Sequence, residues 1–331
     1  MKVRSRSVLL LLTLLTAAVV HGEGIPSKAL LVLSKTERTL AIVDPSNLKV
    51  LARVPVGPDP HEVIASSDGK LAFVSNYGGG VYNTLAVIDL VEQKALPSVD
   101  LGALRAPHGL MFAGGKVWFT AEAAKAIGSY DPVTKKVDLV LGTGQNGTHM
   151  IFVTDDLKRI VTSNIGSGTM TFIDKTSGPG QGGWEQTVVP VGRRAEGFDV
   201  SPDGKELWAA NAQDGTISII DMGTKKVTQT LSASVEGANR LKFTPDGKLV
   251  FVSTLRGTDV SIFDAATRAV KKRVNIGHGA AGIQMQPDGA RVFVACTPDG
   301  YVAILDLKSL EVSGHLDAGK QPDGMAWAVR Q

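Results

Sequence analysis

The chain has 331 residues, of which 43% are hydrophobic and 20% are charged, and these values exclude a disordered chain and a polytopic membrane protein. Glycine is abundant at 37 residues while aromatic residues make up only 5%, which favours many turns over long helices. Cys296 is the only cysteine of the sequence, so no disulfide can form within the chain.

The first 22 residues have the pattern of a secretory signal peptide. Lys2, Arg4 and Arg6 precede the apolar stretch 8–20, and the small residue Gly22 stands before the expected cleavage point. We therefore expect residues 23–331 to form the mature protein, in the periplasm or secreted, with an uncleaved anchor as the alternative. No later apolar run is long enough for a second membrane span.

Cleavage also changes the charge balance. It removes three of the 35 Lys and Arg residues, which leaves 32 to face 32 Asp and Glu residues. A protein that binds nucleic acid without regard to sequence needs a surplus of cations, so this class of partner is not expected.

The chain after the signal peptide is built from seven similar units. A short strand pattern that ends in aspartate recurs at intervals of 42 to 47 residues, and its aspartates are Asp44, Asp89, Asp131, Asp174, Asp221, Asp264 and Asp306. Within each unit a strand, a tight turn, a second strand, a loop, the strand ending in aspartate and a fourth strand follow one another. The turn is Asp-Gly at 68–69, 203–204, 246–247 and 288–289, which is a strong hairpin signal. We expect the repeated aspartates to accept hydrogen bonds from backbone amides of the following turn.

Four antiparallel strands in about 42 residues predict one blade of a β-propeller, and seven units predict a closed ring of seven blades. The first unit lacks its inner strand, because residue 28 already matches a second strand. The segment 322–328 matches the inner strands that begin at Pro60 and Pro107. We therefore predict an all-β fold in which residues 23–331 form one seven-bladed domain and the C-terminal strand completes the N-terminal blade.

These repeats resemble a known family. The segments 200–205, 207–211 and 216–221 are similar to the YVTN-type repeat of exported seven-bladed propellers. The resemblance implies the propeller fold, and the family contains mainly binding and surface proteins, with lactonases and domains of cofactor-bearing oxidoreductases among its relatives. The Tyr-Val-Thr-Asn signature is loose here and reads Phe-Val-Ser-Asn at 73–76 and Phe-Thr-Ala-Glu at 119–122. In this alignment Glu122 takes the position of Asn76.

The start of each inner strand and the end of each second strand should lie at the same mouth of the ring. The first position is occupied by His61, His108, His149, Glu196, Asn239, Ala281 and Asp323. The second is occupied by Ser34, Asn76, Glu122, Asn164, Asn211, Thr254 and Cys296. Two residues further along, the inner strands are apolar. We therefore predict a polar funnel at this mouth, with Arg194 and Arg240 among the basic residues of the loops that lead into it.

Three histidines at one repeat position of consecutive blades are the sharpest functional signal. Imidazole is a common metal ligand, so His61, His108 and His149, with Glu122 or Glu196, could hold zinc, copper or iron. The alternatives are histidines that only bond to the backbone of a neighbouring blade and histidines that act as general acid or base. No cofactor is fixed by the sequence.

Two functions follow from this funnel. The favoured one is a binding or scaffold protein, expected to be a monomer, that takes a small molecule, a metal ion or a protein partner at the funnel face. The alternative is a metal-assisted, lactonase-like hydrolase in which Glu122 or Glu196 serves as the base. The glycine-rich loop 77–84 is a candidate lid, whereas the long insertion 175–186 should project from the opposite face. Asp199 and Lys242 occupy one inner-strand position of adjacent blades and should form an ion pair.

Overall fold

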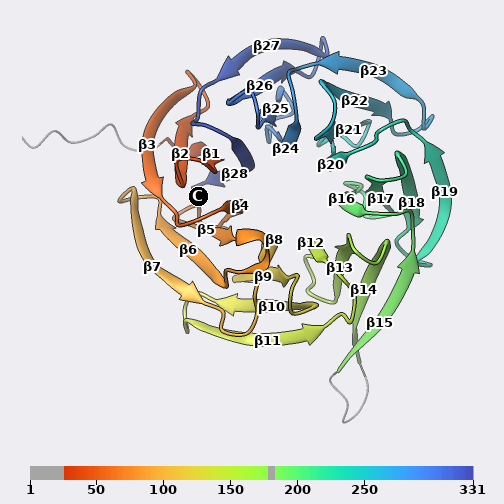
Figure 1. The fold of residues 1–331 in the computed structure, drawn as a ribbon, viewed down its shortest axis with the longest axis horizontal. Helices are drawn as coiled ribbons and strands as arrows, with labels where there is room; N and C mark the ends of the chain where they lie inside the picture. The colour runs from red at the N-terminus through yellow and green to blue at the C-terminus, as the bar shows by residue number, and fades with distance from the viewer. Residues whose placement is uncertain (1–25, 178–182, 331) are drawn as a thin grey trace, which may run out of the picture.

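The computed structural model describes residues 26–177 and 183–330, and within them the strands form seven four-stranded antiparallel sheets arranged in a ring (Figure 1). This is the seven-bladed propeller that the repeats predict. The predicted signal peptide, residues 1–22, lies outside the described part of the chain. Among the described residues there is no helix with the length and apolar character needed to cross a membrane.

The inner strands face the central channel and each is followed outward by a second strand. The inner strands are β4 (Pro60–Ala65), β8 (Pro107–Ala113), β12 (Thr148–Val153), β16 (Ala195–Val200), β20 (Ala238–Phe243), β24 (Ala280–Met285) and β28 (Pro322–Val329). The second strands are β1 (Lys28–Ser34), β5 (Leu71–Asn76), β9 (Lys116–Ala121), β13 (Arg159–Asn164), β17 (Glu206–Asn211), β21 (Leu249–Thr254) and β25 (Arg291–Cys296).

The third and outer strands complete each blade. The third strands are β2 (Thr39–Asp44), β6 (Thr84–Asp89), β10 (Ala126–Asp131), β14 (Thr169–Thr176), β18 (Thr216–Asp221), β22 (Asp259–Asp264) and β26 (Tyr301–Asp306). The outer strands are β3 (Lys49–Pro55), β7 (Lys94–Asp100), β11 (Lys136–Gly142), β15 (Gly183–Pro190), β19 (Lys226–Ser232), β23 (Val270–Asn275) and β27 (Glu311–Leu316). A short 3₁₀ helix, η1 (Gly78–Gly80), lies in the loop after β5.

The C-terminal strand closes the ring, as the sequence predicts. β28 pairs with β1 in the sheet of order β28-β1-β2-β3, with Ala29 opposite Ala328 and Leu31 opposite Ala326. The first and last segments of the described chain thus share one blade, and β1 is paired along both of its edges.

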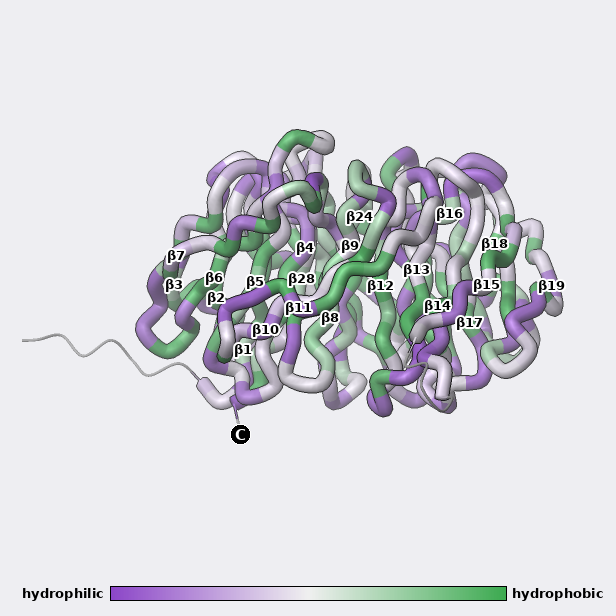
Figure 2. The backbone as a smooth tube through the Cα atoms, turned by 90° about the horizontal axis from the view of Figure 1, so that it is seen from below, coloured by the Kyte–Doolittle hydropathy of each residue, from purple (hydrophilic) through white to green (hydrophobic). Residues whose placement is uncertain are grey.

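Apolar packing between neighbouring blades holds the ring together. Second and third strands are buried on both faces, so they read as short apolar runs rather than as alternating patterns. Large side chains such as Trp208, Phe73 and Phe293 are fully buried between sheets. Figure 2 shows the apolar residues along the strands and hydrophilic residues in many of the loops at both faces.

The repeated aspartates terminate the third strands as predicted, with one exception. Carboxylates such as Asp44 and Asp89 accept hydrogen bonds from backbone amides two or three residues later, for example from Ser46 at 2.8 Å. Asp174 instead bonds to Arg159 and Lys225. Its strand continues past the aspartate to Thr176, so no turn follows directly.

Candidate functional site

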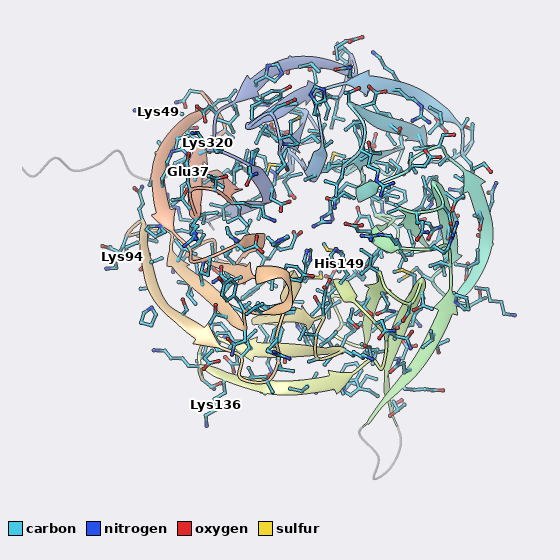
Figure 3. The ribbon with its side chains drawn as sticks, in the orientation of Figure 1. Glu37, Lys49, Lys94, Lys136, His149 and Lys320 are labelled. Atoms are coloured by element: carbon cyan, nitrogen blue, oxygen red, sulfur yellow. The ribbon has the colours of Figure 1, made fainter. Side chains whose placement is uncertain are left out.

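A cavity of about 470 Å³ opens at one mouth of the central channel. Part of its wall is the second residue of each inner strand, namely His61, His108, His149, Glu196, Asn239, Ala281 and Asp323. Figure 3 shows His149 close to the centre of the ring. The repeat phase predicts this convergence, and it brings residues up to 262 positions apart in the sequence onto one surface. Arg194 and Arg240 also line the cavity.

For the rest of the wall, the sequence prediction is wrong by one residue in most blades. The lining positions follow the last residue of a second strand, and they are Lys35, Tyr77, Glu122, Ile165, Leu255 and Thr297. β9 ends at Ala121, which pairs with Pro107 as Asn76 pairs with Pro60. Glu122 is therefore equivalent to Tyr77 and not to Asn76. Successive residues of a strand point to opposite faces, so the residue after the strand end faces the cavity and the last residue of the strand does not. The loose signature aligned Glu122 with the last residues of the other second strands and so hid this difference.

The predicted ligand-binding residues Asn76, Asn164 and Asn211 do not line the cavity. They are buried within their blades and bond to hydroxyl groups of the third strand: Asn76 to Thr84 at 3.1 Å, Asn164 to Thr171 at 2.8 Å and Asn211 to Ser218 at 3.0 Å. The amide side chains therefore tie second strands to third strands. This is a structural role repeated around the ring.

Cys296 was expected at the funnel rim and is instead fully buried in the same strand-end position. Burial raises the pKa of its thiol to about 11. Its Sγ donates to the carbonyl oxygen of Ile276 at 3.2 Å. This thiol lacks the exposure and the low pKa of a reactive cysteine.

Tyr77, Glu122 and His149 form a hydrogen-bonded chain on one side of the cavity. The hydroxyl of Tyr77 donates to Oε2 of Glu122 at 2.7 Å, and Oε1 of Glu122 bonds to Nδ1 of His149. Burial raises the pKa of Glu122, but the hydrogen bonds from His149 and Tyr77 outweigh it and hold the pKa below its ordinary value. Burial and the bond to Glu122 raise the pKa of Tyr77 above its ordinary value. An ionised carboxylate only accepts hydrogen bonds, so Nδ1 of His149 carries the hydrogen.

The imidazole rings of His108 and His149 stack on each other. Their centroids lie 3.8 Å apart with an interplanar angle of 29°, and both residues are more than nine-tenths buried. Burial lowers the pKa of His108 well below its ordinary value, so this ring is neutral. Within the described chain, Nδ1 of His108 and Nε2 of His149 have no hydrogen-bond partner.

His61 is engaged in a separate ionic cluster. The ammonium group of Lys35 lies 2.7 Å from Nε2 of His61 and 3.3 Å from the carboxylates of Asp59 and Asp323. The neighbouring side chains of His61 and Lys35 lower the pKa of Asp59. A lysine ammonium only donates, so Nε2 of His61 is an acceptor. The ammonium of Lys35 thus stands where a metal ion bound to this nitrogen would stand.

The predicted metal-binding triad does not converge on one point. In residues 26–177 and 183–330, no three or more His, Cys, Asp or Glu side chains are arranged to hold a metal ion. Nδ1 of His149 bonds to Glu122, and Nε2 of His61 faces Lys35. Among the described residues, the buried nitrogens of this triad without a hydrogen-bond partner are Nδ1 of His108 and Nε2 of His149.

Glu196 and Asn239 lie next to the histidine pair. Nδ2 of Asn239 donates to Oε1 of Glu196 at 2.7 Å, and the same oxygen lies 3.9 Å from Nε2 of His149. Arg194 stands at the rim, mostly exposed, with its guanidinium 3.8 Å from Oε2 of Glu196. The sequence prediction thus holds for the position of all three residues.

An ion pair across the channel forms the floor of the cavity. Arg240 lies in the inner strand β20, rather than in a loop as the sequence suggested, and its guanidinium bonds to Glu62 of β4. Attraction by Glu62, Asp323 and Glu196 outweighs the effect of burial and raises the pKa of Arg240. A second, mainly apolar cavity of about 320 Å³ lies beyond this pair and is lined by both residues, of which only Arg240 also lines the first cavity.

Glycines at the same level explain why few side chains reach the floor. A Cβ atom at Gly282 would lie 2.2 Å from the carbonyl oxygen of Asp323, and one at Gly324 would lie 2.3 Å from that of His61. At these two glycines the adjacent inner strands approach too closely for any other residue, whereas Glu62, Met150 and Arg240 occupy the same repeat position in other blades. The sequence analysis does not single out Glu62, because this position is glycine in four of the seven inner strands and carries no other acidic residue.

Three other predictions concern one ion pair and two loops. The ion pair of Asp199 and Lys242 is confirmed, with 3.3 Å between its charged atoms. Loop 77–84 begins at Tyr77, whose ring contacts His61 and His108 at centroid distances of 4.8 and 5.3 Å. The insertion 175–186 mostly extends the hairpin of β14 and β15, and residues 178–182 lie outside the described chain.

Comparisons with known proteins support the fold and go no further. No protein-family model and no curated protein matches the chain, so the YVTN resemblance rests on the repeat residues alone. Among solved structures, a functionally unknown protein from Desulfotomaculum acetoxidans is 14% identical, with a TM-score of 0.75 over 92% of this chain and 99% of its own.

Two further solved structures have the same fold. A protein from Bacteroides uniformis, named as a candidate 6-phosphogluconolactonase, is 15% identical with a TM-score of 0.73, over 91% of this chain and 99% of its own. The dihydro-heme d1 dehydrogenase NirN in complex with DHE is 15% identical with a TM-score of 0.62, over 94% of this chain and 77% of its own. At these identities the likeness describes architecture, and a propeller can carry many functions.

Proposed function

We propose that this chain is an exported β-propeller that binds a small molecule in the histidine-lined cavity at one mouth of its channel. One observation carries the proposal: two imidazole nitrogens, of His108 and His149, are buried in the cavity wall without a hydrogen-bond partner among the described residues. A buried polar atom left unpaired costs about 1–3 kcal/mol, so such atoms in a native protein call for a partner. A ligand in the cavity supplies that partner.

The proposal is tested by a screen of the mature protein, residues 23–331, for ligands that raise its melting temperature. The library contains small metabolites together with zinc, copper and iron salts, and hits are measured by calorimetry on the wild type and on His149→Ala. We expect at least one ligand whose affinity falls in the variant. If every hit binds wild type and variant equally, the cavity is not the binding site.

A second candidate is the lactonase-like hydrolase, and the pairing of Glu122 with His149 favours it. Because Glu122 fixes the hydrogen on Nδ1, Nε2 of His149 is left as a base that can take a proton from water. The base is then His149, with Glu122 as its positioning residue. The names of two Bacteroides neighbours associate this fold with lactone chemistry.

The hydrolase candidate is tested by assaying a panel of lactones with and without added divalent metals. Turnover that is lost in His149→Ala and rises with pH through the titration of one group supports it. Absence of hydrolysis with any metal rejects it and leaves binding as the function.

A further inference from the structure

The unpaired polar atoms of the cavity indicate the chemical class of its ligand, an inference that rests on the proposed function. Two of the three buried cavity atoms that lack partners in the described chain are acceptors. Nε2 of His149 has a free lone pair because the hydrogen is on Nδ1. Oδ1 of Asn239 is also unpaired in the described chain, because its amide nitrogen donates to Glu196. Both residues are more than nine-tenths buried.

The donors on the same wall are already used. The hydroxyl of Tyr77 donates to Glu122 and the ammonium of Lys35 faces His61 and two carboxylates. The guanidinium of Arg240 bonds to Glu62 and to the carbonyl oxygen of Asn239. Apart from Arg194 at the solvated rim, a ligand that enters this cavity therefore meets free acceptors and committed donors.

The charges near the cavity also favour a ligand that carries a positive charge. Counting the charged side chains that line it and the carboxylates that bond to those side chains, five carboxylates face three cations. The carboxylates are Asp59, Glu62, Glu122, Glu196 and Asp323, and the cations are Lys35, Arg194 and Arg240. Of the cations, Arg194 is largely solvated at the rim. A positive charge on the ligand stabilises this surplus of carboxylates, because charge interactions inside the cavity are only weakly screened by solvent.

From these two observations we propose that the cavity binds a small organic cation that carries N–H and O–H donors, such as a hydroxylated primary amine. Its ammonium group lies between Nε2 of His149 and the carboxylate of Glu196, whose nearest atoms are 3.9 Å apart. The amide oxygen of Asn239 accepts a further hydrogen. The rings of His61, Tyr77 and His108 form the adjoining wall, and an aromatic face stabilises a neighbouring cation.

Pairs of matched small molecules test this class by calorimetry on the mature protein. Each amine is compared with a neutral counterpart of similar shape: glucosamine with glucose, and ethanolamine with ethylene glycol, while gluconate is the anionic member. We expect at least one amine to bind about tenfold or more tightly than its counterpart, and gluconate not to bind.

Two variants, each of which loses one carboxylate charge, test whether amine binding depends on the cavity or on the rest of the surface. Glu196→Gln keeps an oxygen that can accept from Asn239, and we expect it to weaken amine binding about tenfold with little change in melting temperature. Glu236→Gln removes an exposed carboxylate outside the cavity and should leave binding unchanged.

Three results would overturn the inference: no amine exceeds its neutral counterpart, gluconate binds best, or Glu236→Gln weakens binding as much as Glu196→Gln. A neutral or anionic molecule that binds in the cavity and depends on His149 would keep the proposed function and remove this inference. If nothing binds there, the proposed function falls as well.

Discussion

Two neighbouring positions in each blade behave differently although both are often polar. The last residue of the second strand, such as Asn164 or Asn211, points into the blade and has its hydrogen bonds satisfied by the third strand. The next residue, such as Tyr77 or Glu122, points into the cavity. The difference teaches that a repeated polar residue indicates function only under two conditions. Its side chain must face a cavity, and the fold must leave nearby polar atoms without hydrogen-bond partners. Substitutions can test the two positions separately.

The largest expected effect comes from opening the ring on which both positions depend. Deletion of residues 320–331 removes β28, and with it the inner strand of the blade that contains β1. We expect the deletion variant to lose the cooperative thermal transition, because Leu31 and Val32 of β1 lose their paired strand. Circular dichroism during heating measures this, with a chain that ends at Arg330 as the control. A cooperative transition at the wild-type temperature would contradict the closure.

The floor of the cavity is expected to give the next largest effect. Glu62→Gln leaves the guanidinium of Arg240 buried without its carboxylate, which should lower the free energy of unfolding by about 3–5 kcal/mol. Replacing both residues, with Glu62→Gln and Arg240→Met, should recover most of this loss. Urea denaturation checks both variants. Equal losses in the single and double variants would show that the pair does not bridge the channel.

Asn211→Ala tests the strand-end position. The side chain donates to Thr216 and Ser218 and accepts from the amide of Gly192, so its removal leaves several buried groups unpaired. We expect a loss of about 2–3 kcal/mol in urea denaturation.

Leu255→Ala is the matched variant one residue beyond a strand end, where the side chain lines the cavity and is 47% exposed. Its cost should stay below about 1 kcal/mol, because little apolar area is withdrawn from burial. If Leu255→Ala costs as much as Asn211→Ala, the two positions are not distinct.

The smallest expected effect is a change in the pH dependence of stability at Glu122. Its pKa is lowered in the folded state, so the folded protein binds fewer protons than the unfolded chain as the pH falls below the ordinary glutamate value of about 4.3. The stabilisation is present above that value and is lost as the pH falls through the folded-state pKa. Glu122→Gln should therefore lose less stability between neutral pH and pH of about 3 than the wild type. Identical losses would show that His149 and Tyr77 do not hold the carboxylate ionised.

The fold could be predicted from the sequence because the signals are local and repeated. The strand ending in Asp89 or Asp221, spaced by a blade length, fixes the architecture, and the match of 322–328 to inner strands fixes the closure. The second residue of each inner strand could be predicted for the same reason. Each of these signals depends only on spacing along the chain.

The other half of the cavity wall could not be predicted in the same way. Phe119 was aligned with Phe73, but the strand pairing makes Trp118 the equivalent of Phe73, and this one-residue error placed Glu122 with the asparagines. Tyr77 carries a usable signal, because it directly follows a strand end and precedes three glycines. The bond between Glu62 and Arg240 spans 178 residues and nonadjacent blades, so no spacing along the chain indicates it.

The state of the His149 imidazole tests the account most directly, because both proposals require Nε2 to be an acceptor. Long-range proton–nitrogen NMR spectra of the histidine-labelled mature protein at neutral pH, assigned with His149→Ala, report which ring nitrogen carries hydrogen. We expect a protonated Nδ1 and an unprotonated Nε2, and a shift of the Nε2 signal when an amine is added. A hydrogen on Nε2 in the ligand-free protein would contradict it.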